Sequence, residues 1–367
     1  MDLTPPGAAM SENGAGLAVD IVIDNYNYAR FLPYAIDSAL VQTHEKINVI
    51  VVDDGSTDGS RQVLSDYEDR VAVVLKENGG HASAFNAGIA RCEGDVVILL
   101  DADDVLKPEA AARAAAAFAA DERVVKVQSR MDVVDGEGRP TGAVKPPPHL
   151  PMPNGDVCRA ELSFPFDLPW VPTSANAFRT DALRKILPIP EDAFRMCAER
   201  YLVHLIALLG PVASLEEIGA SYRVHGGNSY EPQEPGLDLD QLRLTIRVEH
   251  SISKGLLRLA ADRGLPHPDR ILSLADLANR MISLRLEPER HPIRGDRRGS
   301  LVVDAVRAAS RRSNISAAMK PLFIAWFVAM ASVPRPLARR LALLFLFPEL
   351  RVSLNRVLGS FQGRRGA

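Results

Sequence analysis

The sequence predicts an α/β protein with a mainly parallel, doubly wound sheet and a C-terminal helical extension. Two observations carry this prediction. Short apolar runs alternate with helix-like segments up to about residue 120, and only helical periodicity remains after Leu237. Apolar runs without internal alternation are typical of strands covered on both faces. The 367 residues, 47% of them hydrophobic, suffice for one large domain and a smaller appended unit.

The elements follow in order along the chain. The predicted strands are residues 17–23, 47–53, 71–75 and 95–100, and the predicted helices are residues 29–41, 59–68, 82–92 and 107–120. Residues 135–169 are rich in Pro and Gly, which predicts a long loop over the site. A helix near 194–209 and a strand pair ending in SYRVHGGNS follow. We expect a disordered leader at 1–17, a main domain at 18–235 and a helical region at 236–367.

Polar clusters stand at the carboxyl ends of the four predicted strands. They are Asp24–Asn27, Asp53–Ser56, Asn78–His81 and Asp101–Asp104. In parallel α/β sheets, ligands bind beyond these strand ends. We therefore expect Asp24, Asn78, Gly79 and Asp101 to face one ligand site.

The strongest chemical signal is LLDADD at 99–104, where an apolar strand runs into three carboxylates. Like charges this close raise one another's pKa unless a cation lies between them. Mn²⁺ or Mg²⁺, held by carboxylates and by substrate phosphate oxygens, suits the pattern, with Asp101 and Asp103 as ligands. Alternatively, the acids belong to a solvated loop in which Asp104 caps the next helix.

The run IVVDDGSTDGS at 50–60 places two more acids, Asp53 and Asp54, at a strand end. A carboxylate there can accept a hydrogen bond from a nucleobase, and one of the two is the candidate for that role. The turn formers that follow explain Asp58 or Ser60 as a helix N-cap, but they explain Asp53 and Asp54 less well.

The chain carries, in order, DNYNYARFLPYAIDSALVQTH, VDDGSTDGS, ENGGHASAFNAGIARCEGD and LLDADD. In this order and spacing the segments resemble family 2 glycosyltransferases, which have the glycosyltransferase A fold. The resemblance covers about residues 18–230 and implies transfer of a sugar from a nucleotide diphosphate donor, most often a UDP-sugar. It makes 18–235 the nucleotide-sugar-binding catalytic domain, and it implies an inverting, metal-dependent transfer to a saccharide or lipid-linked acceptor.

The resemblance also implies roles for single residues. Asp54 matches the acid that binds the base, Tyr26 matches a residue lining the nucleotide pocket, and Asp101 and Asp103 match the DxD pair, with Asp103 the metal ligand. Two positions depart from the family's pattern. Asp24-Asn25 stands where Pro-Thr or Thr-Ser is commoner, and Phe85 stands where many members have an arginine.

An inverting transfer needs a base that takes the proton of the acceptor hydroxyl. In the family this base precedes a helix and a later YRxHxxN stretch, which SYRVHGGNS matches. The spacing favours Glu199 as the catalytic base, with Asp192 second. Alternatively, Glu199 forms an ion pair with Arg195 or Arg200 on an exposed helix face.

Three further features have open interpretations. His225 can bind the metal or the diphosphate, or it belongs to an ordinary turn beside two glycines. Trp170 begins a segment, WVPTSAN, that resembles the family's acceptor-side loop, and its indole either stacks on a sugar or belongs to the core. His81 and the cysteines at 92, 158 and 197 show no ligand spacing, and we assign them no chemistry.

The tail is basic although the whole chain has a formal net charge of −3. Residues 291–367 contain fourteen Lys and Arg and three Asp and Glu, a net charge of +11. Apolar runs at 320–334 and 341–347 are interleaved with these charges and are shorter than the roughly 20 residues of a spanning helix. We expect helices that lie on a membrane surface or pack on protein.

Three scattered cysteines and a start without a basic and apolar signal segment indicate a cytoplasmic protein, peripheral at the inner face of the membrane if the tail binds there. The alternatives in function are a sugar nucleotidyltransferase and a non-catalytic sugar-nucleotide-binding scaffold. The first would need a Gly-rich, Arg-bearing loop where the chain has DNYNYARF, and a dehydrogenase would need GxGxxG there. We expect no nucleic-acid partner.

Overall fold

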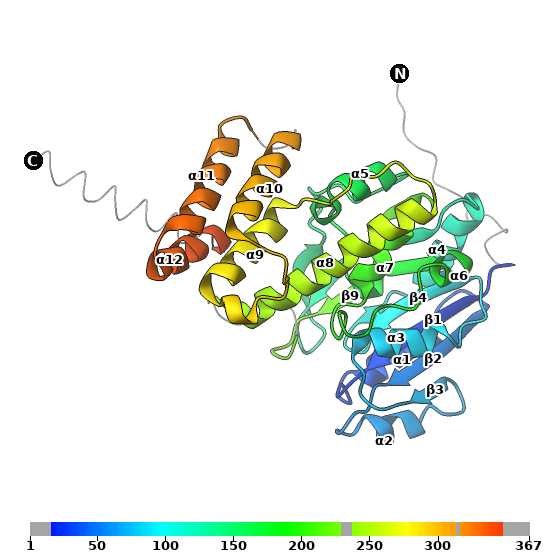
Figure 1. Ribbon diagram of the computed structural model, residues 1–367. Coiled ribbons are helices and arrows are strands. Elements are labelled where there is room, and N and C mark those ends of the chain that lie inside the picture. The colour runs from blue at the N-terminus through cyan, green and yellow to red at the C-terminus, as the bar shows by residue number, and fades with distance from the viewer. Residues whose placement is uncertain (1–15, 229–236, 313–315, 348–367) are drawn as a thin grey trace, which may run out of the picture. The chain divides into compact units, whose positions relative to one another are not determined.

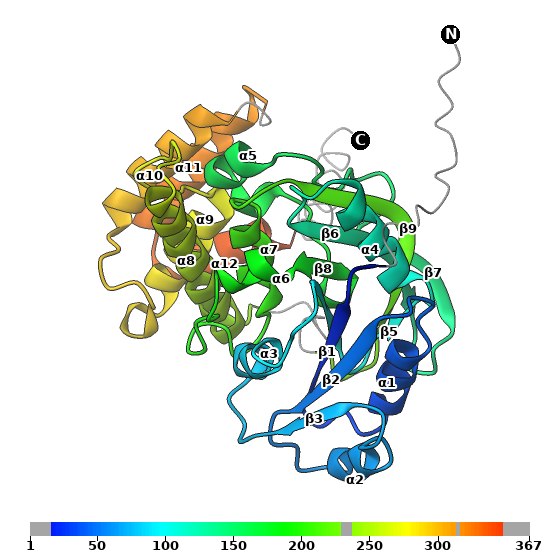
Figure 2. The ribbon, with the colours of Figure 1, turned by 90° about the vertical axis from the view of Figure 1, so that its right-hand side faces the viewer.

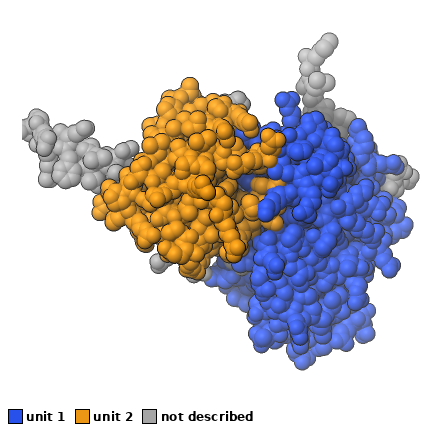
Figure 3. All heavy atoms as spheres, viewed as in Figure 1, with its two compact units in different colours: residues 1–229, 254–268 blue, residues 230–253, 269–367 orange. Residues whose placement is uncertain are grey.

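The computed structural model describes residues 16–228, 237–312 and 316–347. The chain divides into two compact units, coloured separately in Figure 3. Unit 1 comprises residues 1–229 and 254–268, and unit 2 comprises residues 230–253 and 269–367. Most of the predicted leader and the predicted boundary at 235/236 lie outside the described residues.

The first half of unit 1 alternates strands and helices as the sequence predicts (Figure 1). Its elements are β1 (Val19–Asn25), α1 (Leu32–Leu40), β2 (Ile47–Asp53), α2 (Ser60–Ser65), β3 (Ala72–Leu75), α3 (His81–Ile89), β4 (Val96–Asp101) and α4 (Ala110–Ala120). The strands lie in the order β3-β2-β1-β4, and all three pairs are parallel. Their carboxyl ends therefore meet at one edge of the sheet.

Both faces of β1 are buried, because α1 and α3 cover opposite sides of it (Figure 2). Ile21 and Ile23 belong to one core cluster with Leu32 and Ile36 of α1. On the other face, a Cβ built at Gly88 of α3 would lie 2.4 Å from a methyl group of Val22. This two-sided burial explains why Ile21, Val22 and Ile23 of β1 are apolar at successive positions and not at alternate ones.

Beyond β4 the same nine-stranded sheet becomes mixed. The added strands are β5 (Val105–Leu106), β6 (Lys126–Val134), β7 (Pro140–Lys145), β8 (Asn176–Arg179) and β9 (Val212–Arg223). β8 pairs antiparallel with both β4 and β6, whereas β9 runs parallel to β6. The α/β class is confirmed, and its parallel part is the β3-β2-β1-β4 half together with the β6-β9 pair. β5 pairs antiparallel with β9 and so brings the end of β9 to the DADD segment.

The second half of unit 1 differs from the prediction in two places. Residues 135–169 are not one loop, because β6 and β7 form an antiparallel pair and α5 (Cys158–Ser163) follows. A short connection at 135–139, with Gly138 at φ +81°, allows this pairing without a crossover helix. The expected strand pair near 212–223 is the single long strand β9. The helix expected near 194–209 is α7 (Glu199–Ile206), preceded by α6 (Thr180–Arg184).

From residue 237 onward the described residues form helices, as predicted. They are α8 (Leu239–Asp262), α9 (Leu274–Leu286), α10 (Arg298–Arg311), α11 (Met319–Ser332) and α12 (Arg335–Leu346). Met281 of α9, Leu301 of α10 and Phe327 of α11 belong to the core cluster of unit 2. Among the described helices, none combines the length and the apolar character that crossing a bilayer requires.

We expect Gly88→Val to lower the free energy of unfolding by about 1–3 kcal/mol, because added carbons in a close-packed interface force shifts in backbone and side chains. A Cβ at this position already meets Val22 at 2.4 Å and Val52 at 3.0 Å. Urea unfolding would measure the change. Ala90→Val, at an exposed position directly after α3, is the control and should change little. Equal stability of the two variants would contradict close packing of α3 on β1 and β2.

Candidate active site

Two aspartates lie side by side at the carboxyl ends of adjacent parallel strands. Asp24 of β1 is in register with Asp101 of β4. Burial raises the pKa of Asp24 well above its usual range, and the charges of Asp101 and Asp103 raise it further while His81 lowers it. This edge of the sheet therefore concentrates negative charge where the sequence predicted a ligand.

His81, to which the sequence analysis assigned no chemistry, lies among these acids. Its Nε2 is 3.5 Å from Asp24 Oδ2 and 3.5 Å from Asp101 Oδ1, and its Nδ1 is 3.9 Å from Glu199 Oε2. Burial lowers the pKa of His81, but the surrounding carboxylates outweigh it and raise the pKa to about 10. The backbone N–H of Ala198, however, donates to Nδ1, which requires that this nitrogen carries no proton.

Several buried polar atoms of the cluster have no hydrogen-bond partner within the described structure. They are Asp24 Oδ1, Asp101 Oδ1, His81 Nε2 and Glu199 Oε2. Ligand atoms of Asp24, His81 and Asp101 lie within 4.8 Å of one another, and so do those of Asp101, Asp103 and Asp104. A divalent cation would satisfy such oxygens. It would also offset the negative charge that favours the protonated form of His81, in agreement with the hydrogen bond that the N–H of Ala198 donates to the ring. The donor set therefore fits a hard divalent cation.

The structure brings Asp103 and His225, two of the candidate metal ligands, into direct contact. His225 Nε2 is 3.0 Å from Asp103 Oδ2, and the imidazole packs against Phe31 with 4.6 Å between the ring centroids. Burial raises the pKa of Asp103, whereas its hydrogen bond with His225 lowers it. Imidazole and carboxylate in direct contact form a pair of ligands suited to a first-row divalent metal.

Asp104 is a structural residue, and the alternative in which it lies in a solvated loop and caps the next helix is wrong. Its side chain is buried, with Oδ2 accepting from Ser174 Oγ at 2.7 Å and Oδ1 accepting from the backbone N–H of Arg223 at 2.9 Å. Ser174 Oγ also accepts from the N–H of Asp101 at 3.1 Å. Helix α4 begins after Glu109 instead. Asp104 thus fixes the DADD segment to the end of β9 and to the loop before β8.

Asp53 and Asp54 are both buried and both engaged inside the protein. Asp54 accepts from Lys76 Nζ at 2.6 Å, from the N–H of Gly79 at 3.0 Å and from the N–H of Gly80 at 2.7 Å. Asn78 Nδ2 donates to the same carboxylate at 3.2 Å. Asp54 therefore holds the turn at 76–80, and a base can bond to it only by sharing or replacing one of these donors.

Asp53 holds the neighbouring turn in the same way. It accepts from Asn25 Nδ2 at 2.9 Å, from the N–H of Ser56 at 3.2 Å and from Arg61 Nε at 3.3 Å. Tyr26, in contrast, is 46% exposed beside this turn, to which Asn27 is bonded through Ser56. The open surface near the strand ends thus presents an aromatic ring and turn backbone more than it presents the two carboxylates.

Glu199 is the first residue of α7 and its carboxylate faces the acid cluster through His81. Burial raises the pKa of Glu199 above its usual range, and the charge of His81 lowers it. Arg195, one of the ion-pair partners considered for it, donates to Asn78 Oδ1 at 2.8 Å. Asp192 is exposed in the turn before this segment. The geometry groups Glu199, and not Asp192, with the predicted site.

Trp170 belongs to a buried cluster with charged members. The ammonium of Lys126 lies 4.2 Å from the centroid of its ring, and the ring meets His204 of α7 edge-on. His204 Nδ1 is 2.5 Å from Glu161 Oε1 of α5. Burial lowers the pKa of Lys126 well below its usual range. Of the two interpretations of Trp170, packing against the protein accounts for these contacts.

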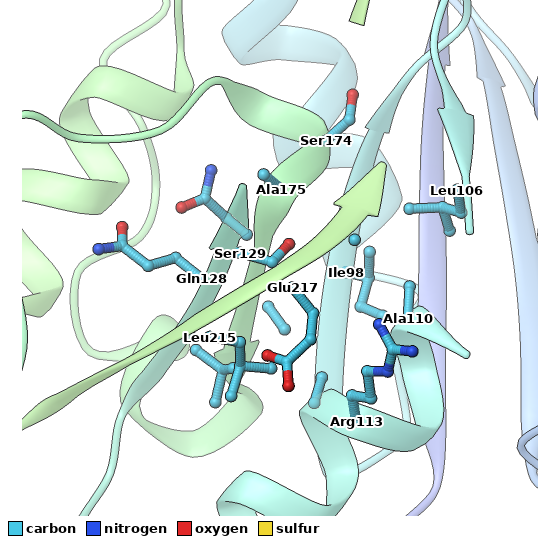
Figure 4. Close-up of a pocket in the computed structure, with 15 residues that line it drawn as sticks. Ile98, Leu106, Ala110, Arg113, Gln128, Ser129, Ser174, Ala175, Leu215 and Glu217 are labelled. Carbon is cyan, nitrogen blue, oxygen red and sulfur yellow. The ribbon is translucent and has the colours of Figure 1, made fainter. Parts of the chain in front are cut away.

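A separate pocket lies among β4, β6, β9 and α4 (Figure 4). Its walls include Ile98, Leu106, Ala110 and Leu215, with Arg113 and Glu217 also facing it. It encloses about 30 Å³, which is room for a water molecule and not for a sugar. Asp24, Asp101 and Glu199 are not among its lining residues, so we do not identify it with the acid cluster.

Comparisons with known proteins identify the family of the chain. Residues 20–187 match the family model described as glycosyl transferase family 2. An uncharacterised glycosyltransferase of Nostoc sp. (strain PCC 7120) is 36% identical over 218 residues, covering 58% of this chain and 67% of the relative. One from Rickettsia prowazekii is 42% identical over 99 residues, which are 27% of this chain and 31% of that protein. The match to that relative therefore covers less than a third of its length.

Among solved structures, residues 1–349 of S. aureus TarS in complex with UDP give a TM-score of 0.51 at 17% identity. The alignment covers 86% of this chain and 88% of that one, and at this identity it shows the fold alone. Fold, strand-end acids and sequence relatives agree: the chain belongs to the family 2 glycosyltransferases, enzymes that depend on nucleotide sugars, and it has the glycosyltransferase A type of fold.

Proposed function

We propose that this glycosyltransferase moves a sugar from a UDP-sugar to a saccharide or lipid-linked acceptor, with inversion and with a bound Mn²⁺ or Mg²⁺. One observation supports the proposal: Asp24, Asp101 and Glu199 each have a buried oxygen without a hydrogen-bond partner in the described structure, and each of these carboxylates has an oxygen within 3.9 Å of a ring nitrogen of His81. A buried carboxylate that the protein leaves unpaired is costly unless a ligand pairs with it. The choice of UDP draws on TarS, which has been solved with UDP and with UDP-GlcNAc.

The metal is proposed to bind Asp101, Asp103 and His225. Asp104 is unsuited, because the protein's own donors already engage both of its oxygens. A divalent cation held there neutralises charge on the leaving nucleotide diphosphate. Asp103 and His225 are in contact at 3.0 Å, and ligand atoms of Asp101 and Asp103 lie within 4.8 Å of each other.

Donor binding is proposed to use the turns beyond β1, β2 and β3. Tyr26 offers an exposed ring on which a base can stack. Asn78 and Gly79 form the turn that Asp54 holds, and Asp53 fixes the turn beside Tyr26. Asp24 lies next to Asp101 and so faces the diphosphate end of the donor. In this proposal Asp53 and Asp54 act mainly by fixing these turns.

Glu199 is proposed as the base that deprotonates the acceptor hydroxyl in a single displacement, without a covalent intermediate. A carboxylate with a raised pKa accepts a proton more readily than a solvated one, and burial raises the pKa of Glu199. Its carboxylate lies 3.9 Å from Nδ1 of His81, whereas Asp24 and Asp101 each lie 3.5 Å from Nε2 of the same ring. Asp192 remains the second choice, with the disadvantage that it is exposed.

Calorimetric titration with UDP, dTDP and GDP, with and without Mn²⁺, should show binding of UDP that depends on the metal. Asp103→Asn should weaken that binding at least about tenfold, because a metal ligand loses its charge. Asp181→Asn is the matched control, since Asp181 is a highly exposed acid on α6. UDP affinity that is the same with and without Mn²⁺ would contradict the proposed site. So would a folded protein that binds none of the three nucleotides.

Replacing Glu199 by Gln should lower kcat by about 10²–10⁴-fold while the affinity for UDP with Mn²⁺ stays unchanged. The measurement is UDP release, with an acceptor selected from a panel of saccharides and polyprenyl-phosphate glycolipids. Asp192→Asn should retain activity within a few-fold. Full activity in the Glu199 variant, together with loss in the Asp192 variant, would move the base to Asp192.

We also propose that unit 2 attaches the enzyme to the cytoplasmic face of a membrane. Residues 316–347 contain four basic residues and no acidic one. On α11, Leu322 is 62% exposed and Val328 is 48% exposed, and on α12 Leu337 is 48% exposed. Exposed apolar side chains flanked by cations are the pattern of a helix that lies in the interface of an anionic bilayer.

Co-sedimentation should therefore show binding of the full chain to vesicles containing phosphatidylglycerol, and not to pure phosphatidylcholine vesicles. Leu322→Glu with Val328→Glu should reduce the bound fraction at least about fivefold, because the double variant loses apolar contact with the bilayer and gains negative charge. Tyr34→Glu, at a 59% exposed position on α1, is the control. If the double variant still binds, the membrane contact does not involve Leu322 and Val328. If the wild type does not bind, the proposed membrane attachment is refuted.

A further inference from the structure

The start of α3 is bonded to the chain that leads into α7. The N–H of His81 donates to the carbonyl of Arg195 at 3.0 Å, and the N–H of Ala82 donates to the carbonyl of Phe194 at 3.0 Å. These are the first amides of α3, which have no partner within their own helix. The junction is tight, since a Cβ at Gly80, whose φ is +89°, would lie 2.8 Å from the backbone of Arg195. Only glycine is suited to this position.

The imidazole of His81 continues this junction into the site. Its Nδ1 accepts from the N–H of Ala198, the residue directly before Glu199, at 3.2 Å. Because that nitrogen accepts, the ring proton belongs on Nε2, which faces Asp24 and Asp101 at 3.5 Å each. One ring thus contacts the acids at the strand ends with one nitrogen and the start of α7 with the other.

The segment that leads into α7 contains a residue in a strained backbone conformation. Cys197 has a φ of +56°, a left-handed conformation that is unfavourable for a residue with a side chain. A strained residue persists only where the surrounding structure over-determines it. The hydrogen bonds that Arg195 and Ala198 make to His81 lie on either side of Cys197 and hold it in place.

We propose that His81 is a positioning residue that sets the distance of Glu199 from the donor-side acids Asp24 and Asp101. The inference rests on the proposed role of Glu199 as the base. His81 itself need not touch the acceptor or exchange a proton. It acts through the Nδ1 contact that fixes Ala198 and hence the first turn of α7. A base displaced by about 1 Å can lose about 100-fold in rate.

Two amide substitutions separate the two nitrogens of the ring. In His81→Asn the side-chain oxygen can take the place of Nδ1 and keep the bond from Ala198. In His81→Gln the longer side chain reaches towards Asp24 and Asp101 instead, and the bond from Ala198 is lost. His81→Ala removes both contacts. His267→Asn, at an exposed histidine of the same unit, controls for loss of an imidazole elsewhere.

The experiment measures UDP release, with Mn²⁺, from the UDP-sugar that the wild type turns over fastest, and measures UDP affinity by calorimetry. We expect kcat to fall about 100-fold in His81→Gln and His81→Ala but less than about tenfold in His81→Asn. UDP affinity should stay within about threefold in all three. In a Glu199→Gln background, His81→Ala should cause no further loss of kcat, because the effects of substituting residues that act as a unit are not additive.

Different outcomes would overturn the inference. If His81→Asn lowers kcat as much as His81→Gln does, His81 does not act through Glu199. The same conclusion follows if His81→Ala lowers kcat as much in the Glu199→Gln background as in the wild type. If UDP affinity falls more than tenfold, His81 serves the donor or the cation instead. Failure of the proposed function looks different, since Glu199→Gln would then be fully active or the wild type would not bind UDP.

Discussion

The repulsion among carboxylates at the ends of β1 and β4 is the constraint on which the rest of the site depends. Parallel pairing puts Asp24 beside Asp101, and Asp103 and Glu199 lie close enough to add to the field that raises neighbouring pKa values. Like charges at this spacing cannot all remain ionised without a compensating cation. Packing that buries both faces of β1 fixes the strands, so the acids cannot move apart.

Asp103 pairs with His225, and the other acids of the site divide into two groups. Asp53, Asp54 and Asp104 are satisfied by donors of the protein itself, such as Arg61, Lys76 and Ser174. Asp53 and Asp54 hold turns, and Asp104 fixes the DADD segment to the end of β9. Asp24, Asp101 and Glu199 keep buried oxygens without partners in the described structure. The first group builds a rigid frame, and we propose that the second pairs with the ligand, which is the division that a preorganised electrostatic site requires.

Periodicity predicted the first four strands and the helices between them, because each is a local property of a buried segment. Asp24, Asp101, Asp103 and Glu199 were likewise predicted as site residues from strand ends and from resemblance to a family, and they stay predictions. The role of Asp104 could not be predicted, since its partners Ser174 and Arg223 lie 70 and 119 residues away in the chain. Such bonds depend on how β8 and β9 join the sheet, and these strands are not set by local pattern.

His81 was missed for the same reason. Its bonding partner Ala198 is 117 residues away, so spacing in the sequence gave no ligand pattern. Its position at a strand end, after two glycines and at the start of a helix, was the available signal. Trp170 similarly resembled an acceptor-loop residue, but the contacts with Lys126 and His204 that explain it come from β6 and α7.

The central claim is that the acids beyond β1 and β4 hold a divalent cation together with the donor diphosphate. Anomalous diffraction from crystals grown with UDP and Mn²⁺ tests it most directly. We expect one strong peak about 2.0–2.3 Å from carboxylate oxygens of Asp101 and Asp103 and from His225 Nε2, in contact with a diphosphate oxygen. A peak that avoids Asp103, or UDP bound at this edge without any metal peak, would contradict it.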